Sequence, residues 1–242
     1  MTDTPALSNR LHDGVLALPS GPLVEASLAA ARAAVHPSVL NHCIRGFYWS
    51  RLFAAHKRVL NDADYDEELL FAANVLHDLG TGPDAPGLLR FEIESADLAA
   101  ALLTGLGAPA ADVDKVWEAI ALHTTPQIPE RLGLLTYLTY EGIWVDFGKN
   151  ADLVAEEQKQ IHGAYPRLRM AHHLAEQVLA HGARSETAAP PYALAFHLAQ
   201  ERAADGVTTM EPGALRDEDW SGLAGLAGAD SHVRCVAENP AE

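Results

Sequence analysis

Cysteine is scarce in this chain, because only Cys43 and Cys235 occur among its 242 residues. Two cysteines are too few for a disulfide framework or a cysteine-rich metal knuckle. Basic residues are also few, with 17 Lys plus Arg against 33 Asp plus Glu and a net charge of −16. Nucleic acids and anionic membranes are bound by basic surfaces, so we expect neither as a partner.

Long apolar runs are missing as well. The most apolar stretch, about residues 98–111, contains Thr104, Gly105 and Gly107 and is too short to span a bilayer. The segment MTDTPALSNRLHDG lacks the basic and apolar parts of a secretory signal, so we expect a cytoplasmic protein. The sequence also lacks a phosphate-binding glycine loop, a Gly-x-Ser-x-Gly elbow and a His-Glu-x-x-His zinc helix.

Helical periodicity is present along most of the chain, and no strand-like alternation accompanies it. Ser38 is the expected cap of one helix, and Pro166 the expected first residue of a later one. The sequence therefore predicts an all-α fold with one helical domain over 1–204 (core about 30–180) and an irregular tail over 205–242. The helices are expected at about 22–34, 38–57, 69–79, 92–104, 110–123, 130–147, 166–178 and 192–204.

Two histidines and two aspartates fall on inward faces of these helices. His42 lies near the start of one helix, and His77 and Asp78 follow the apolar run LLFAANVL. If these two helices are antiparallel, a rise of ~1.5 Å per residue brings His42 and His77 to within about one turn of each other. Asp146 continues the inward stripe of Gly142. Such groups are costly to bury unpaired, and a divalent cation bound by imidazole and carboxylate removes that cost.

A purely structural interpretation stays open for each residue alone. A histidine at a helix end is often a cap or a hydrogen-bonded core residue, and Asp78 could simply pair with Arg45. The order His, then His-Asp after an apolar run, then a distant Asp on a helix favours a shared site.

The strings NHCIR, LLFAANVLHDLG and GIWVDFGKN resemble the H…HD…D signature of the HD-domain superfamily of helical metal-dependent hydrolases. Over roughly residues 30–170, NHCIRGFYW, RFEIESADLAA and VWEAIALHT are also similar to the cyanamide hydratase-like branch. The resemblance implies an HD-type helical bundle whose metal ligands are His42, His77, Asp78 and Asp146. Cys43 departs from the pattern, since a small hydroxyl residue is expected beside the first ligand.

Other candidate site residues follow from the resemblance and from the helical stripes. Arg90 and Glu92 could form an ion pair that braces the site, or one could contact substrate, although Glu92 also suits a helix start. His123 faces inward with Ile120, either at the metal or substrate or as a core histidine. We take Glu92, His123 and Arg90 as catalytic candidates.

The substrate-binding candidates are Asn74, Thr124 and Arg45, since Asn74 lies three residues before His77 and Thr124 follows His123. The later histidines have no matched partners, and we expect most of them at the surface. These are His162, His172, His173, His181 and His197.

The expected chemistry is attack by metal-activated water. In the cyanamide hydratase-like branch the substrate is a small nitrile, so the resemblance implies a hydratase, with cyanamide to urea as its reaction. It also implies zinc, while iron, manganese, cobalt or nickel would suit the same ligands. Whether one ion or two is bound stays open.

Two alternatives remain. A phosphohydrolase acting on a nucleotide or a phosphate monoester would need several basic residues near the metal, where the sequence offers Arg45, Arg90 and Lys149. The second alternative is a non-catalytic, metal-stabilised binding module. The expected partner is a small-molecule substrate, and the apolar face around Trp144 could serve a homo-oligomer.

Overall fold

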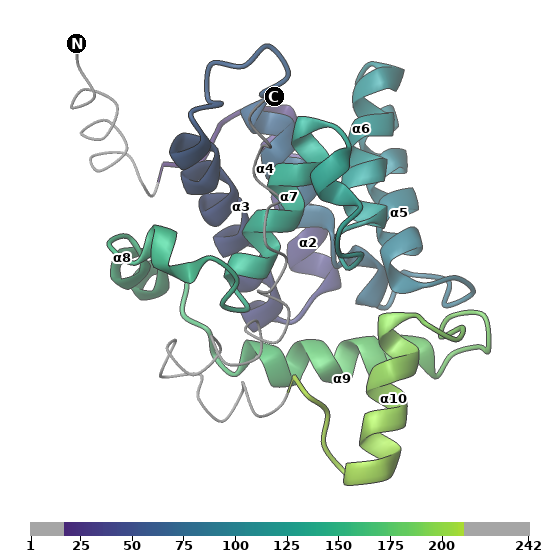
Figure 1. Ribbon diagram of the computed structural model, residues 1–242. Coiled ribbons are helices and arrows are strands. Elements are labelled where there is room, and N and C mark those ends of the chain that lie inside the picture. The colour runs from purple at the N-terminus through teal and green to yellow at the C-terminus, as the bar shows by residue number, and fades with distance from the viewer. Residues whose placement is uncertain (1–16, 211–242) are drawn as a thin grey trace, which may run out of the picture.

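The computed structural model describes residues 17–210, and every regular element in that range is helical (Figure 1). The all-α fold expected from the sequence is therefore observed. The elements are α2 (Pro22–Ala34), α3 (Pro37–Lys57), α4 (Glu67–Leu76), η1 (Leu79–Thr81), α5 (Phe91–Gly105), α6 (Ala110–Ala121), η2 (Pro129–Arg131), α7 (Leu134–Val145), η3 (Ala151–Val154), α8 (Gln158–Ala164), α9 (Met170–Gly182) and α10 (Leu194–Asp205).

The N-cap of helix α3 is His36 rather than the expected Ser38, two residues earlier in the chain. The Nδ1 atom of His36 accepts a hydrogen bond from the backbone N–H of Ser38 at 3.2 Å. Pro37 then occupies the first helical turn, where its missing N–H costs nothing. This start places His42 in the second turn of a helix whose next residues are almost all buried.

Helices α3 and α7 lie side by side through the middle of the molecule (Figure 1). Their close approach depends on Gly142, because a Cβ atom there would overlap Ser50 Oγ and the carbonyl oxygen of Gly46. Because Gly46 and Ser50 on α3 and Gly142 on α7 are small, the backbones of the two helices come into contact. This contact brings His42, on α3, close to Asp146, at the end of α7.

Helix α4 begins at a capped position and ends where the site begins. The Asp66 side chain accepts a hydrogen bond from the backbone N–H of Leu69, and the helix ends at Leu76. His77 is its C-cap, and Asp78 precedes η1. Gly80 follows, where a Cβ atom would overlap the carbonyl oxygen of Phe91, so η1 lies directly against the start of α5.

The later helices differ most from the sequence-based expectation. Helix α7 begins at Leu134, after the short η2, rather than near residue 130. Helix α9 begins at Met170 rather than at Pro166, because Leu168 (φ 52°) and Arg169 (φ 59°) adopt left-handed backbone conformations that interrupt a helix. Helix α8 was not expected.

Helix α9 crosses one end of the bundle, and α10 packs against α9 (Figure 1). A second apolar cluster holds them there, in which Val39 and Cys43 of α3 pack with Leu174 and Val178 of α9 and Leu198 of α10. The main cluster lies among α2 to α7 and includes Val154 of η3 and Ile161 of α8. No helix in residues 17–210 is long and apolar enough to cross a membrane. Of the expected tail over 205–242, residue 205 ends α10 and residues 206–210 form no regular element, while residues 211–242, Cys235 among them, lie outside the described residues.

Two expectations about side-chain exposure are wrong. Helical periodicity over 110–123 predicts Trp117 on the inward stripe with Val116 and Ile120, but Trp117 is 37% exposed and its Nε1–H donates to Asp97. His181, expected at the surface, is fully buried, and its Nε2–H donates to the carbonyl oxygen of Leu89 at 2.8 Å. Of the other late histidines, only His197 is exposed; His162, His172 and His173 are partly buried.

Candidate metal centre

The imidazole of His42 is fully buried, and a hydrogen bond at one of its two nitrogens fixes its orientation. Its Nδ1 atom lies 2.7 Å from Oδ2 of Asp146. Because the carboxylate is the acceptor, Nδ1 carries the proton and Nε2 keeps its lone pair. Among the described residues Nε2 has no hydrogen-bond partner. Burial lowers the pKa of His42 even though Asp146 opposes this, so the ring is neutral near pH 7.

Asp146 differs from its expected role, because its carboxylate is already surrounded by donors. Arg45 donates to Oδ1 at 2.8 Å and to Oδ2 at 2.7 Å, and Trp49 Nε1 donates to Oδ1 at 3.0 Å. Arg167 lies 3.5 Å from Oδ1 and donates to the backbone carbonyl of Asp146. Burial acts to raise the pKa of Asp146, but Arg45 and Arg167 hold it well below its usual range. The structure thus makes Asp146 the anchor of His42.

The ring of His77 is oriented by the end of α4. Its Nδ1–H donates to the carbonyl oxygen of Asn74 at 2.7 Å, which leaves Nε2 3.1 Å from Oδ2 of Asp78. A lone pair on His77 Nε2 would repel the Asp78 carboxylate at this distance. Either a proton on Nε2 or a bound cation between the two groups removes this repulsion. Burial opposes charge on both residues. Even so, Asp78 raises the pKa of His77 well above its usual value, and His77 lowers the pKa of Asp78 to about 2.

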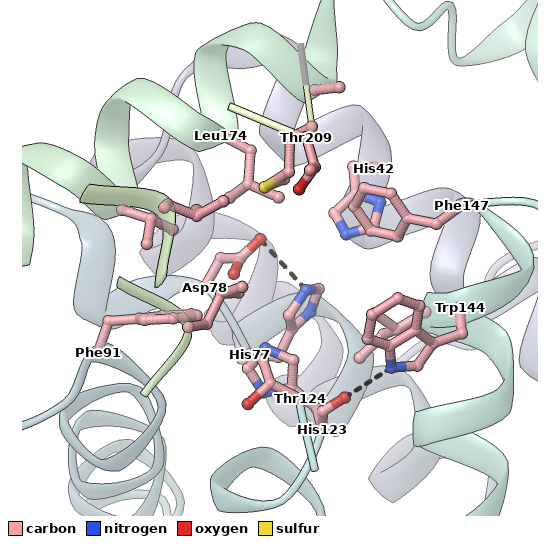
Figure 2. Close-up of a pocket in the computed structure, with 16 residues that line it drawn as sticks. His42, His77, Asp78, Phe91, His123, Thr124, Trp144, Phe147, Leu174 and Thr209 are labelled. Atoms are coloured by element: carbon pink, nitrogen blue, oxygen red, sulfur yellow. Dashed lines mark hydrogen bonds and ion pairs between the residues drawn. The ribbon is translucent and has the colours of Figure 1, made fainter. Parts of the chain in front are cut away.

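His42, His77 and Asp78 meet at one point (Figure 2). Each offers one ligand atom, these atoms all lie within 4.8 Å of one another, and all three residues are buried. An unpartnered imidazole nitrogen beside a second imidazole and a carboxylate is a donor set that suits a divalent transition metal. Both histidines have their Nδ1–H bound outside the group, as metal-binding histidines usually do. These three residues could therefore hold a metal ion, and Asp146 supports them.

Cys43, the departure noted in the sequence, lies next to this group. Its thiol is buried and is 3.9 Å from Oδ2 of Asp78, within the range of a weak hydrogen bond. Burial raises the pKa of Cys43, so the sulfur keeps its proton and acts as a donor to the carboxylate.

His123 extends the polar side of the site. Its ring centroid lies 4.7 Å from that of His77, and its Nδ1–H donates to the carbonyl oxygen of Ile120 at 2.6 Å. Burial, and then the nearby His77, lower the pKa of His123 to about 4. The indole N–H of Trp144 donates to the carbonyl oxygen of His123 at 3.0 Å (Figure 2). His123 is thus a neutral imidazole fixed on the wall of the cavity described below.

Glu92, Arg90 and Thr124 form a connected network beside His123. Arg90 donates to Glu92 at 2.8 Å, and the Thr124 hydroxyl donates to the same Oε1 atom at 2.7 Å. Burial acts to raise the pKa of Glu92, but Arg90 and His123 lower it. Thr124 lines the cavity, whereas Glu92 and Arg90 stand behind it. The bracing ion pair that the sequence offered as one alternative is present.

Two of the substrate-binding candidates do not line the cavity. The Asn74 side chain accepts from Ser50 Oγ and donates to the backbone carbonyl of Leu70, while the backbone carbonyl of Asn74 accepts from His77 Nδ1–H. Arg45 is fully buried and bound to Asp146. Both residues position the histidines.

A cavity of about 380 Å³ opens from the metal-binding group. His42, His77, Asp78, His123 and Thr124 supply one side of it, while most of the remaining lining is apolar. Figure 2 shows His77 in the middle with Asp78, His42 and His123 around it, and with Phe91, Trp144, Phe147 and Leu174 farther out. Trp144, offered above as part of a dimer face, lines this cavity.

Several of these residues were missed at the level of sequence. Trp49 had a signal, because His42, Arg45 and Trp49 follow one another at helical spacing and so share one face of α3. Arg167 and the apolar residues of α10 had none, since they reach the site only through the irregular segments before α9 and α10.

No protein-family model matches the chain, and no curated protein matches it either.

Proposed function

We propose that this chain is a metal-dependent hydratase or hydrolase that adds water to a small nitrile-type substrate, with cyanamide to urea as the first reaction to test. One observation carries the proposal. Within residues 17–210, His42 Nε2 is a buried lone pair without a hydrogen-bond partner, and it points into the same space as His77 Nε2 and the Asp78 carboxylate.

His42, His77 and Asp78 are the residues that would hold the ion, with zinc as the expected metal and iron, manganese, cobalt or nickel as alternatives. When bound, a divalent ion lowers the pKa of water towards about 7 and polarises an electrophilic carbon. The three side chains are kept in place by hydrogen bonds from outside the group, through Asp146, Asn74 and Cys43.

The neighbouring side chains supply the remaining requirements of hydration. The water oxygen bonds to the nitrile carbon, and the nitrile nitrogen gains a proton before the product rearranges to an amide. His123 has only Nε2 available to the cavity, because Nδ1 is bound to Ile120, and this nitrogen is suited to move that proton. The apolar walls keep bulk water from the reacting atoms.

The distribution of charge supports an uncharged substrate over a phosphorylated one. No lysine or arginine lines the cavity in the described part of the chain. Arg45 and Arg167 are engaged with Asp146, and Arg90 with Glu92. A transferred phosphoryl group would need such side chains directed at it.

The test is a paired assay on purified protein of measured metal content. Urea released from cyanamide, and lost when the metal is removed, would support the proposal. Phosphate released from a nucleotide panel, with no urea from cyanamide, would replace it with a phosphohydrolase.

A further inference from the structure

The cavity above the metal-binding group is larger than cyanamide requires. Its volume is about 380 Å³, within the range of ordinary ligand pockets. A water molecule occupies about 30 Å³ in the liquid, so a substrate with three non-hydrogen atoms would leave most of this cavity unfilled. Either water fills the remainder or the substrate does.

The walls away from the metal-binding group are unsuited to ordered water. Leu174 and Val178 of α9 and Leu194 and Leu198 of α10 line the cavity. All four side chains are aliphatic, so they offer no hydrogen bonds to water. A buried water molecule needs two to four polar partners. The far part of the cavity therefore favours an apolar occupant.

Apart from Thr209, whose hydroxyl is bound to Glu201, the polar residues of the cavity lining lie next to one another. The ligand atoms of the three ligand residues lie within 4.8 Å of one another, and the His123 ring centroid is 4.7 Å from that of His77, so a bound molecule is directed with its polar, reactive group towards them. A molecule bound with the opposite orientation would leave its polar group without partners and would place apolar atoms against buried imidazoles. The cavity thus fixes orientation as well as size.

We propose that the substrate is a nitrile bearing an apolar body of about six to ten carbon atoms, which fills the far part of the cavity. The inference rests on the proposed function, because that function supplies the reacting group. The oxygen of water bonds to the nitrile carbon, one π bond of the C≡N group breaks, and the nitrogen takes the proton. The resulting imidic acid tautomerises to the primary amide.

The test uses the full chain, loaded with zinc, and a series of straight-chain alkyl nitriles from acetonitrile to decanenitrile, with cyanamide alongside. Binding is measured by calorimetry and amide formation by mass spectrometry. Each added methylene that enters the apolar part is expected to tighten binding about fourfold until the cavity is full.

Binding that does not change with chain length would overturn the inference, including the case in which the segment following Met210 occupies the cavity. Binding that tightens with chain length but yields no amide would leave the apolar site standing and overturn the proposed chemistry. The two failures are therefore distinguishable.

Two cavity variants that act in opposite directions complete the test. Val178→Phe fills space and is expected to move the best-binding nitrile to a shorter chain, and Leu198→Ala opens space and moves it to a longer one. Leu106→Phe, at an exposed position after α5, is the matched control and should leave the optimum unchanged. Metal content should stay the same in all three. An unchanged optimum in both folded cavity variants would overturn the inference.

Discussion

His42 Nδ1 lies 2.7 Å from Asp146 Oδ2, although the two residues are 104 positions apart in the sequence. The same carboxylate receives two hydrogen bonds from Arg45 and one from Trp49, so it joins three side chains of α3 to the end of α7. The orientation of the first candidate metal ligand therefore depends on the contact that also holds the two central helices together.

Replacing the candidate ligands should abolish metal binding. His77→Ala and Asp78→Ala each remove one of three donors, so we expect the bound metal measured by mass spectrometry to fall to background, and turnover with it. His197→Ala is the matched control, because His197 is exposed on α10. Activity that persists in a metal-free His77→Ala protein would refute the site.

Asp146→Asn should weaken both the fold and the metal site. The substitution removes the charge that compensates Arg45 in the core, so the free energy of unfolding should fall by about 3–5 kcal/mol. Loss of the anchor of His42 should also lower metal affinity about 10- to 100-fold.

Urea denaturation and metal titration measure these two effects of Asp146→Asn. The matched control is Asp97→Asn, because Asp97 is an exposed carboxylate that accepts from Trp117, and its loss should cost less than about 1 kcal/mol. Equal losses of stability in the two variants would contradict the anchoring role.

Gly142→Ala should destabilise the protein because a methyl group there overlaps Ser50 and Gly46. We expect a loss of at least about 1–3 kcal/mol in thermal or urea unfolding. Gly163→Ala, in α8, meets no atom within 4 Å and should instead stabilise by about 0.5–1 kcal/mol. If the two substitutions shifted stability in the same direction, the close packing of α3 and α7 would be disproved.

Glu94 should make stability depend on pH. Its carboxylate accepts hydrogen bonds from the backbone N–H groups of Gly87, Leu88 and Leu89, which lower its pKa despite burial. A lowered pKa in the folded state means that the stabilisation is present above the unfolded-state pKa of about 4.3 and is lost as the pH falls through the folded value.

Glu94→Gln is therefore expected to cost about 1–3 kcal/mol at pH 7 and progressively less below about pH 4. Urea unfolding of wild type and variant across this range measures the difference. A penalty that stayed constant down to pH 3 would show that the charge of Glu94 is unimportant.

The sequence predicted that His42 and His77 lie close together. Their levels along two antiparallel helices are determined by the helical rise per residue and by the length of the turn that connects the helices. It could place Asp146 on an inward face, but the role of that carboxylate depends on Arg45 and Trp49 lying one and two turns along α3. The only sign of this role in the sequence is that His42, Arg45 and Trp49 are spaced so that they share one face of a helix.

The far wall of the cavity could not be predicted in the same way. It depends on where α9 crosses the bundle and α10 packs on it, and the left-handed conformations of Leu168 and Arg169 determine where α9 begins. Neither residue type signals that conformation, since side chains of this size usually avoid it. The expected helix start at Pro166 failed for this reason.

The two ends of the cavity come from separate parts of the chain. The metal-binding group and His123 belong to residues 42–123, anchored by Asp146, whereas residues from 171 onward build much of the apolar wall. On the proposed function, substitutions in α9 and α10 would change which molecules the cavity accepts without replacing any of the three candidate ligands. Cys43 is the link between the two parts, because it packs against α9 and α10 and also contacts Asp78.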